Sequence, residues 1–350
     1  MSLLLTILAL GFVVFIHELG HLLAAKRARV GVTEFAVGMG PKLVSIPFKG
    51  TMYSIRLLPV GGFVKVKGLD ETENCPIEED YREKTLWARS SIIVAGSLFN
   101  IILGFVIFML IGIFVGKPMV SPTIQKVMPD MPAQTLGLAQ GDIITHINMK
   151  PVTAVATDII QVISQSNGES VLLAYERNGA PNTVTVSPIQ SDNGKYIIGV
   201  VFGASVQPLS LWQAVTYGVH RTGFTIGQTF VSLNMLFTGK ATVKDLAGPV
   251  GIVQIAAAQL HTSFFAFLGL MAFISISLGV INLFPLPVLD GGHLVFLAIE
   301  GVRGRPLNKK AETIINNVAA TLLIGLMVFI VFNDVVNWSS RVDILKEVKP

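Results

Sequence analysis

The sequence predicts a polytopic α-helical membrane protein with four transmembrane helices, a membrane-associated β-hairpin or small sheet, and an α+β insert. The chain is 51% hydrophobic and only 14% charged, whereas soluble domains carry about 25% charged residues. Helices that cross a bilayer need roughly 20 apolar residues, and residues 3–25, 91–115 and 264–283 meet that length, while 319–332 forms the core of a fourth span. Residues 116–205 instead show short strand-like runs around one helical pattern, which predicts a compact α+β module.

Charge and cysteine content exclude several classes of protein. The formal net charge is +4 and the basic residues form no patch typical of nucleic-acid binding. We therefore expect the protein to contact a lipid bilayer and no nucleic acid. Cys75 is the only cysteine. An intrachain disulfide and a metal site made of thiolates are therefore both excluded.

The first apolar stretch contains His17, Glu18 and His21 as its only ionisable groups. Residues four apart lie on one face of a helix, so both imidazoles can bind one ion, and neutral imidazoles suit Zn²⁺. The neighbouring Glu18 can accept a proton from an attacking water, which is the chemistry of the His-Glu-x-x-His signature. A lone charge at mid-membrane costs about 2.5–3.5 kcal/mol, so three ionisable groups there predict a zinc site.

Basic residues set the expected orientation. Lys26, Arg27 and Arg29 follow the first span, whereas a cleavable signal peptide carries its positive charge before the apolar run. We therefore expect a retained span with the N-terminus outside and Lys26 in the cytoplasm. The His-Glu-x-x-His motif then lies near the cytoplasmic side of the membrane.

Residues 34–67 are predicted to form short strands. Runs at 42–48 and 51–58 flank a turn at Phe48-Lys49-Gly50-Thr51, and Gly61 and Gly62 precede Phe63 and Val64. Two interpretations stay open: a sheet lining a protein cavity whose edge pairs with an extended peptide, or a cytoplasmic hairpin without a ligand. The acidic stretch 70–84 is predicted to be a solvated linker.

The second span carries a polar Asn100, which should face a partner helix rather than lipid. A structural role and a role as a substrate contact both stay open for it. Residues 116–205 then combine extended runs at 123–127, 142–147, 171–176 and 183–186 with a helix at 156–164 and a turn at Arg177-Asn178-Gly179. Two crossings place this insert outside the cytoplasm.

Residues 210–237 are apolar, but polar residues such as His220 and Arg221 interrupt them. If this segment crossed the membrane, the next span would run outward and leave Asp290 a membrane thickness away from His21. We therefore predict that it lies on the outer surface as an amphipathic helix. The span 264–283 then runs inward and delivers Asp290 to the depth of His21.

Residues 282–292 are the second stretch with chemistry. Catalytic zinc keeps three protein ligands, and Asp290 is the expected third, with helix capping as its alternative role and His293 as a weaker rival. Pro285 and Pro287 break the helix and leave free carbonyls, and Asn282 could hold a substrate main chain. Basic residues at 303–310 place the following loop in the cytoplasm and the tail 341–350 outside.

Together these motifs resemble the site-2 protease family of intramembrane zinc metalloproteases, and within it the bacterial regulator of sigma-E protease group. The insert is similar to a single PDZ domain over residues 132–144. The motifs that carry the family resemblance are His17-Glu18-Leu19-Gly20-His21, Gly61-Gly62-Phe63, Gly96-Ser97-Leu98-Phe99-Asn100 and residues 282–291.

The resemblance implies zinc held by His17, His21 and Asp290, with Glu18 as general base. It also implies that Asn282, Pro285 and Pro287 lie near the substrate and that residues 61–66, which include Gly61, Gly62, Phe63 and Val64, pair with it. The implied substrates are single-pass membrane proteins of the anti-sigma factor type, cut in a bacterial inner membrane. The PDZ-like insert would be periplasmic and would contact the substrate's ectodomain stub or C-terminus.

The expected domains are 1–115 with the first two spans, 116–205 as the insert, 206–262 as a membrane-surface region, and 263–350 with the last two spans. Two other functions stay open. A metal transporter would also place histidine and aspartate inside the membrane and would pass metal across vesicles. A non-catalytic scaffold would work through its insert and would not need His17, Glu18 and His21.

Overall fold

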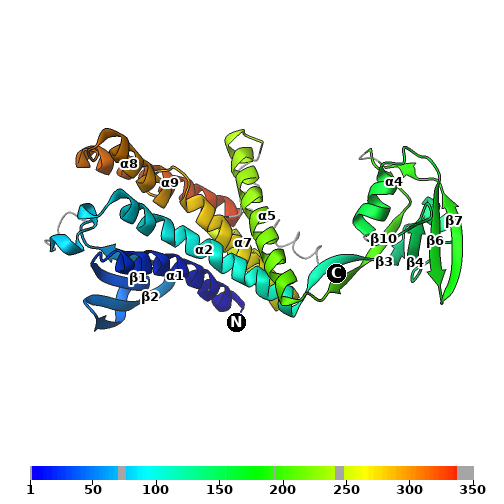
Figure 1. Ribbon diagram of the computed structural model, residues 1–350, viewed down its shortest axis with the longest axis horizontal. Coiled ribbons are helices and arrows are strands. Elements are labelled where there is room, and N and C mark those ends of the chain that lie inside the picture. The colour runs from blue at the N-terminus through cyan, green and yellow to red at the C-terminus, as the bar shows by residue number, and fades with distance from the viewer. Residues whose placement is uncertain (1, 70–75, 154, 192–193, 241–247, 337–350) are drawn as a thin grey trace. The chain divides into compact units, whose positions relative to one another are not determined.

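The computed structural model describes residues 2–69, 76–153, 155–191, 194–240 and 248–336 (Figure 1). Cys75, residues 70–75 of the acidic linker and the tail 341–350 lie outside the described residues. The chain divides into two compact units. Unit 1 contains Met1–Ile113 and Ser210–Pro350, and unit 2 contains Phe114–Leu209.

Four helices of unit 1 are long and apolar enough to cross a membrane, which confirms the predicted spans. The α2 helix starts five residues before the predicted 91, and α9 is longer than the predicted core 319–332. These four helices are α1 (Ser2–Arg27), α2 (Leu86–Phe114), α7 (Phe264–Asn282) and α9 (Lys309–Val336).

The described part of unit 1 has three further α-helices: α5 (Leu211–Phe237), α6 (Pro249–Thr262) and α8 (Asp290–Arg303). Two single 3-10 turns, η1 (Ile77–Glu79) and η2 (Tyr81–Glu83), precede α2. In α5 the buried polar side chains are Thr222, Thr225 and Thr229, and the Thr229 hydroxyl lies 3.1 Å from that of Ser277 on α7. A polar face of α5 therefore packs on α7, while its position at the membrane surface stays a prediction.

The strands β1 (Val32–Phe48) and β2 (Thr51–Val66) pair in antiparallel fashion through the predicted turn, where Lys49 and Gly50 both have positive φ. Both strands bend. Residues 34–37 consequently pair with 52–55 on one side and with 62–65 on the other. Irregular register of this kind strengthens the local twist and leaves residues 62–66 at one edge of the sheet.

This sheet packs against α1. A Cβ atom on Gly11 would lie 2.4 Å from the Pro59 carbonyl oxygen, so the helix and β2 touch backbone to backbone. The outer part of the sheet exposes large apolar side chains, a surface that fits lipid better than water. These side chains are Met39, Leu43, Val44, Ile46, Phe48, Ile55, Leu57 and Leu58.

Unit 2 is an α+β module, as predicted for the insert. Its main sheet has the strand order β10-β3-β4-β6-β7, with β5 paired to β4, and β8 pairs with β9. The strands are β3 (Lys117–Val127), β4 (Ile143–Ile147), β5 (Lys150–Pro151), β6 (Val171–Arg177), β7 (Ala180–Val186), β8 (Ile189–Gln190), β9 (Tyr196–Ile197) and β10 (Val200–Gln207). Its helices are α3 (Pro132–Thr135), the π-helical turn η3 (Ala156–Gln161) and α4 (Val162–Ser164).

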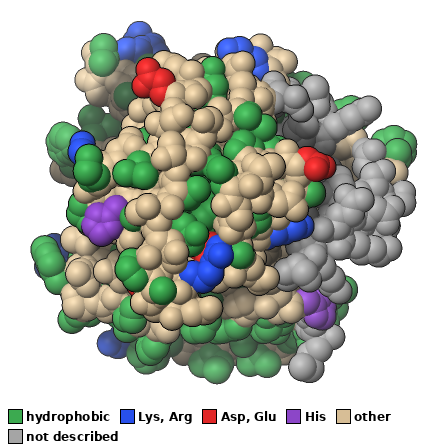
Figure 2. All heavy atoms as spheres, turned by 90° about the vertical axis from the view of Figure 1, so that its right-hand side faces the viewer, with side chains coloured by type: hydrophobic (Ala, Val, Ile, Leu, Met, Phe, Trp, Pro, Cys, Tyr) green, Lys and Arg blue, Asp and Glu red, His purple; other side chains and the backbone are tan. Residues whose placement is uncertain are grey.

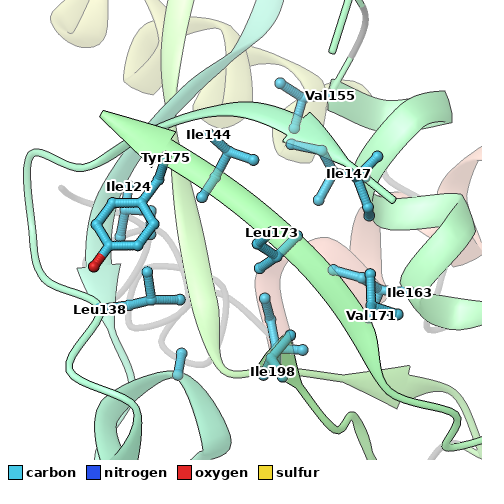
Figure 3. Packing of buried hydrophobic residues seen from close by; sticks show 13 residues of the cluster. Ile124, Leu138, Ile144, Ile147, Val155, Ile163, Val171, Leu173, Tyr175 and Ile198 are labelled. Atoms are coloured by element: carbon cyan, nitrogen blue, oxygen red, sulfur yellow. The ribbon is translucent and has the colours of Figure 1, made fainter. Parts of the chain in front are cut away.

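Figure 3 shows the core of unit 2, where side chains from the sheet meet the helical segment 156–164. Ile144, Leu173 and Ile159 are buried almost completely. Unit 2 therefore has a hydrophobic core of its own. On the face seen in Figure 2, charged side chains are scattered rather than gathered into one patch.

Candidate metal centre

His17 and His21 lie one turn apart on α1 and direct their rings at Asp290, the first residue of α8. The two Nε2 atoms are 3.1 Å apart. Oδ2 of Asp290 lies 3.3 Å from Nε2 of His17 and 3.5 Å from Nε2 of His21. We call these three residues the metal triad.

The spacing of the triad fits a zinc ion. Ligand atoms at roughly 2.0–2.1 Å from a tetrahedral Zn²⁺ are about 3.3–3.4 Å from one another. The three observed separations of 3.1, 3.3 and 3.5 Å lie close to that value on either side. Within the described residues, the group of three metal-ligating side chains that converges in this way is His17, His21 and Asp290. The rival His293 stacks edge-on against Phe296 instead.

The backbone of α2 positions His21. Nδ1 of the imidazole lies 2.8 Å from the Ile92 carbonyl oxygen, which can accept a hydrogen bond from Nδ1–H and so leaves Nε2 free for a metal. The ring can approach because α2 carries glycine at position 96. A Cβ atom there would lie only 2.2 Å from Nε2 of His21.

His17 is buried and has asparagines on both sides of its ring. Nδ2 of Asn100, on α2, lies 3.4 Å from Nδ1, the nitrogen that faces away from the triad. Nδ2 of Asn282, at the end of α7, lies 3.3 Å from Nε2, the nitrogen that faces the triad. Asn282 therefore stands beside the candidate metal position and Asn100 stands behind the ligand.

A strained connection brings Asp290 to the triad. Val288, a β-branched residue, has φ +76°, a conformation that non-glycine residues rarely adopt. Two residues after it, α8 begins at Asp290 itself, and no side-chain bond is formed by the N-cap residue Leu289. Asp290 thus is not the N-cap; its Oδ2 accepts a hydrogen bond from the Ser97 hydroxyl at 3.4 Å and faces the histidines.

Glycines 291 and 292 allow that connection to fold over the start of α8. A Cβ atom on Gly291 would lie 2.1 Å from the Phe284 carbonyl oxygen, and one on Gly292 would lie 2.4 Å from that of Leu286. Pro285 is exposed in this loop. Pro287 is half-buried against Gly292. Both prolines therefore lie in the segment that connects α7 to α8.

Glu18 lies next to the edge of the β1–β2 sheet. The Val64 backbone amide is within hydrogen-bonding reach of its carboxylate, and a Cβ atom on Gly62 would lie 3.3 Å from its Cγ. Gly61, with φ +82°, packs on Met39, and Phe63 lies under the guanidinium of Arg56. Of the predicted strand residues, Gly62 and Val64 thus meet Glu18, while Gly61 and Phe63 support the sheet.

The sequence reasoning missed three groups that hold the triad: Gly96, Ser97 and the Ile92 carbonyl. The signal for the first two was present, because both lie in the stretch 96–100 that carried the family resemblance. A backbone carbonyl that receives a histidine proton leaves no trace in the sequence.

The fold and the site define a multi-pass membrane protein of the zinc metalloprotease class. The family model for peptidase family M50 matches residues 5–326. The chain belongs to peptidase family M50.

Curated relatives agree with this assignment over nearly their whole length. The zinc metalloprotease RasP of Geobacillus kaustophilus is 30% identical over 406 residues, which covers 94% of this chain and 96% of that one. The regulator of sigma-W protease RasP of Bacillus subtilis is 29% identical over 409 residues, with 94% and 97% covered. A Clostridium acetobutylicum relative reaches 37% identity over 336 residues, with 96% and 97% covered.

Two solved structures match part of the chain. The PDZ domain of the SdrC-like protein from Listeria monocytogenes has a TM-score of 0.21 and 22% identity, and covers 23% of this chain and 84% of that one. Its counterpart from Listeria innocua has a TM-score of 0.23 and 20% identity, and covers 25% and 99%.

Proposed function

We propose that this chain hydrolyses a peptide bond inside the transmembrane segment of single-pass membrane proteins, with the metal triad as zinc ligands and Glu18 as general base. The observation that carries the proposal is the tetrahedral spacing of three ligand atoms, two of which lie on a helix fit to span a membrane. Three protein ligands are also the number that catalytic zinc sites use. A glutamate next to the triad completes the set that hydrolysis requires.

When bound, zinc supplies a Lewis acid that polarises the scissile carbonyl and lowers the pKa of an attacking water. Glu18 takes the proton of that water and returns it to the leaving amine. The Glu18 carboxylate lies beside Val64 and Gly62 at the sheet edge, so proton transfer and peptide binding would take place side by side. Asn282, beside Nε2 of His17, is placed to donate its amide to the substrate main chain.

A helical substrate hides its carbonyls in hydrogen bonds and must unwind before it is cut. The edge of the β1–β2 sheet supports this step. Within the described residues, 62–66 pair only with β1, so their other edge can pair with an extended peptide in the place of the lost helical bonds. Gly62 lies in this edge strand beside Glu18, so a peptide paired there would run next to the general base.

The substrate class follows from the relative in Bacillus subtilis, whose name makes it a regulator of sigma-W. We propose substrates of the anti-sigma factor type. Unit 2 would contact the stub of the substrate or its freed C-terminus. It offers a groove of about 420 Å³ along the edge strand β10, lined among others by Ile160, Ile163, Val201 and Phe202.

The orientation of the protein is part of the proposal. Lys26 and Arg27 end α1, and Arg303 and Arg305 lie at the end of α8, so the positive-inside rule places both ends in the cytoplasm. Unit 2 then lies outside a bacterial inner membrane, and the triad lies nearer the cytoplasmic side. Residues 206–262 lie at the outer membrane surface in this arrangement.

The first test compares the wild-type chain with Glu18→Gln in detergent, using a tagged single-pass substrate and scoring bound zinc in both. We expect cleavage by the wild type alone and zinc in both proteins. Cleavage by Glu18→Gln at the wild-type rate contradicts the role of Glu18. Zinc flux across vesicles without any cleavage supports a transporter instead, and a cellular role that survives loss of His17, Glu18 and His21 supports a scaffold.

A further inference from the structure

Asn100 is fully buried in α2 and is held rigidly behind His17. Its backbone carbonyl accepts a hydrogen bond from the Ser275 hydroxyl at 2.8 Å, and Gly279 of α7 packs against its Cβ. Its side-chain amide faces Nδ1 of His17 at 3.4 Å. Within the described residues, Oδ1 of that amide is buried and has no hydrogen-bond partner.

The position of the proton on the His17 ring decides whether the oxygen or the nitrogen of the Asn100 side-chain amide must face that ring. Nε2 of His17 points at Nε2 of His21 and Oδ2 of Asp290, so a metal held by the triad takes the Nε2 lone pair. A neutral imidazole then carries its proton on Nδ1 and needs an acceptor there. His21 meets the same requirement with the Ile92 carbonyl.

We propose that Asn100 is a positioning residue whose Oδ1 accepts a hydrogen bond from the Nδ1–H group of His17 when the triad holds a metal. Rotating an amide by 180° exchanges its oxygen and nitrogen at almost no change in shape, so the buried pocket admits this orientation. The rotation turns Oδ1 toward Nδ1 of His17 and moves Nδ2 to the place that Oδ1 holds now, so an acceptor replaces a donor opposite the Nδ1–H group. The proposal rests on the proposed role of His17 as a zinc ligand, and it replaces the predicted substrate contact for Asn100.

Two substitutions separate the acceptor role from a purely structural one. Asn100→Leu keeps the volume of the side chain and removes every hydrogen-bonding group, whereas Asn100→Asp presents only acceptor oxygens when ionised. The experiment measures zinc affinity of the full-length protein in detergent by competition with a chromophoric chelator. Asn317→Leu, an exposed position on α9, is the matched control.

We expect Asn100→Leu to bind zinc about 10–100-fold more weakly than the wild type, as loss of a partner behind a metal ligand commonly does. Asn100→Asp and Asn317→Leu should stay within about threefold of it. Equal loss of affinity in Asp and Leu variants, with apo-protein unfolding unchanged, overturns the proposal. Unchanged zinc affinity in Asn100→Leu with a raised KM also overturns it and restores the substrate contact.

A measurement on the wild type can overturn the proposal even if a variant fails to fold. In protein labelled with ¹⁵N-histidine and loaded with zinc, His17 should show a protonated Nδ1 and a metal-bound Nε2. An Nδ1 that carries no proton overturns the proposal. Wild-type protein that binds no zinc contradicts the proposed function itself, whereas zinc binding that ignores position 100 contradicts this inference alone.

Discussion

Arg89, near the start of α2, and Glu300, near the end of α8, form a two-point ion pair. Nη1 of the guanidinium lies 3.1 Å from Oε2, and Nη2 pairs with Oε1. The buried ring of Tyr81 lies 5.9 Å from the guanidinium carbon. Since Asp290 begins α8 and meets Ser97 of α2, the pair anchors the far end of the helix that carries the third ligand.

Arg89→Met should destabilise the protein strongly, because it leaves the Glu300 carboxylate without its partner in a largely buried place. We expect a loss of about 3 kcal/mol in the free energy of unfolding and weaker zinc binding. Thermal unfolding in detergent, with and without zinc, measures both. Lys67→Met is the control, since its partner Glu79 is exposed and the cost should stay below about 1 kcal/mol.

Gly96→Ala should displace His21 and empty the metal site. The new Cβ would stand 2.2 Å from Nε2, so the ring must leave its position or α1 and α2 must separate. Substitution of a residue behind a metal ligand commonly lowers metal affinity at least about tenfold, and here the ligand itself must move. We therefore expect zinc affinity to fall at least about tenfold and the cleavage rate to fall with it. Gly227→Ala on α5 meets open space and should change neither; equal effects at both positions would rule out the steric explanation.

Gly62→Ala should impair catalysis while zinc stays bound. Its Cβ would lie 2.8 Å from the Ala36 carbonyl oxygen and 3.3 Å from Cγ of Glu18, so the sheet edge must shift beside the general base. A shift of about 1 Å near reacting groups can cost on the order of 100-fold in rate, so kcat/KM should fall at least about tenfold. Gly203→Ala in β10 is the control, and loss of zinc in Gly62→Ala would show that the edge supports the metal rather than the substrate.

Unit 2 should lose stability in acid through Asp142. Hydrogen bonds from Arg177 lower the pKa of Asp142 below its ordinary 3.8, against the opposing effect of burial and with help from the Ala139 amide. A lowered pKa adds stability that is complete above pH 3.8 and is lost as the pH falls through the folded-state value. Hydrogen exchange of the β4 and β6 amides, corrected for the intrinsic rate, should therefore speed up below about pH 4. The variant Arg177→Met should be less stable than the wild type already at pH 7, because the buried Asp142 carboxylate then loses its main hydrogen-bond donor.

Much of this architecture could be predicted because hydrophobic length and turn chemistry are local. The four spans, the turn at Lys49 and Gly50 and the helical stretch 156–164 all follow from neighbouring residues. The start of α2 could not be placed, because Arg89 resembles a membrane boundary until its partner Glu300, 211 residues away, is known. The double pairing of residues 34–37 likewise depends on bulges that no alternation of residues reveals.

The metal triad also has features that could be predicted from neighbouring residues and features that could not. His17 and His21 are four residues apart, so one turn of helix places them on the same face. Counting the membrane crossings that precede Asp290 was enough to predict that it lies at their depth. The orientation of each ring depends on α2, through a carbonyl at Ile92, a missing side chain at Gly96 and an amide at Asn100. Contacts between helices that are distant in sequence decide these details.

The positions of the three ligands in the sequence determine when the metal triad is complete during synthesis of the chain. Asp290 follows His17 by 290 − 17 = 273 residues, so a ribosome that adds roughly 5–20 residues per second finishes the ligand set tens of seconds after it makes the first ligand. During that interval the nascent chain exposes a glutamate and two histidines to the membrane but lacks the third ligand. The metal triad is therefore completed only after α1, α2, α5, α6 and α7 of unit 1 have been made.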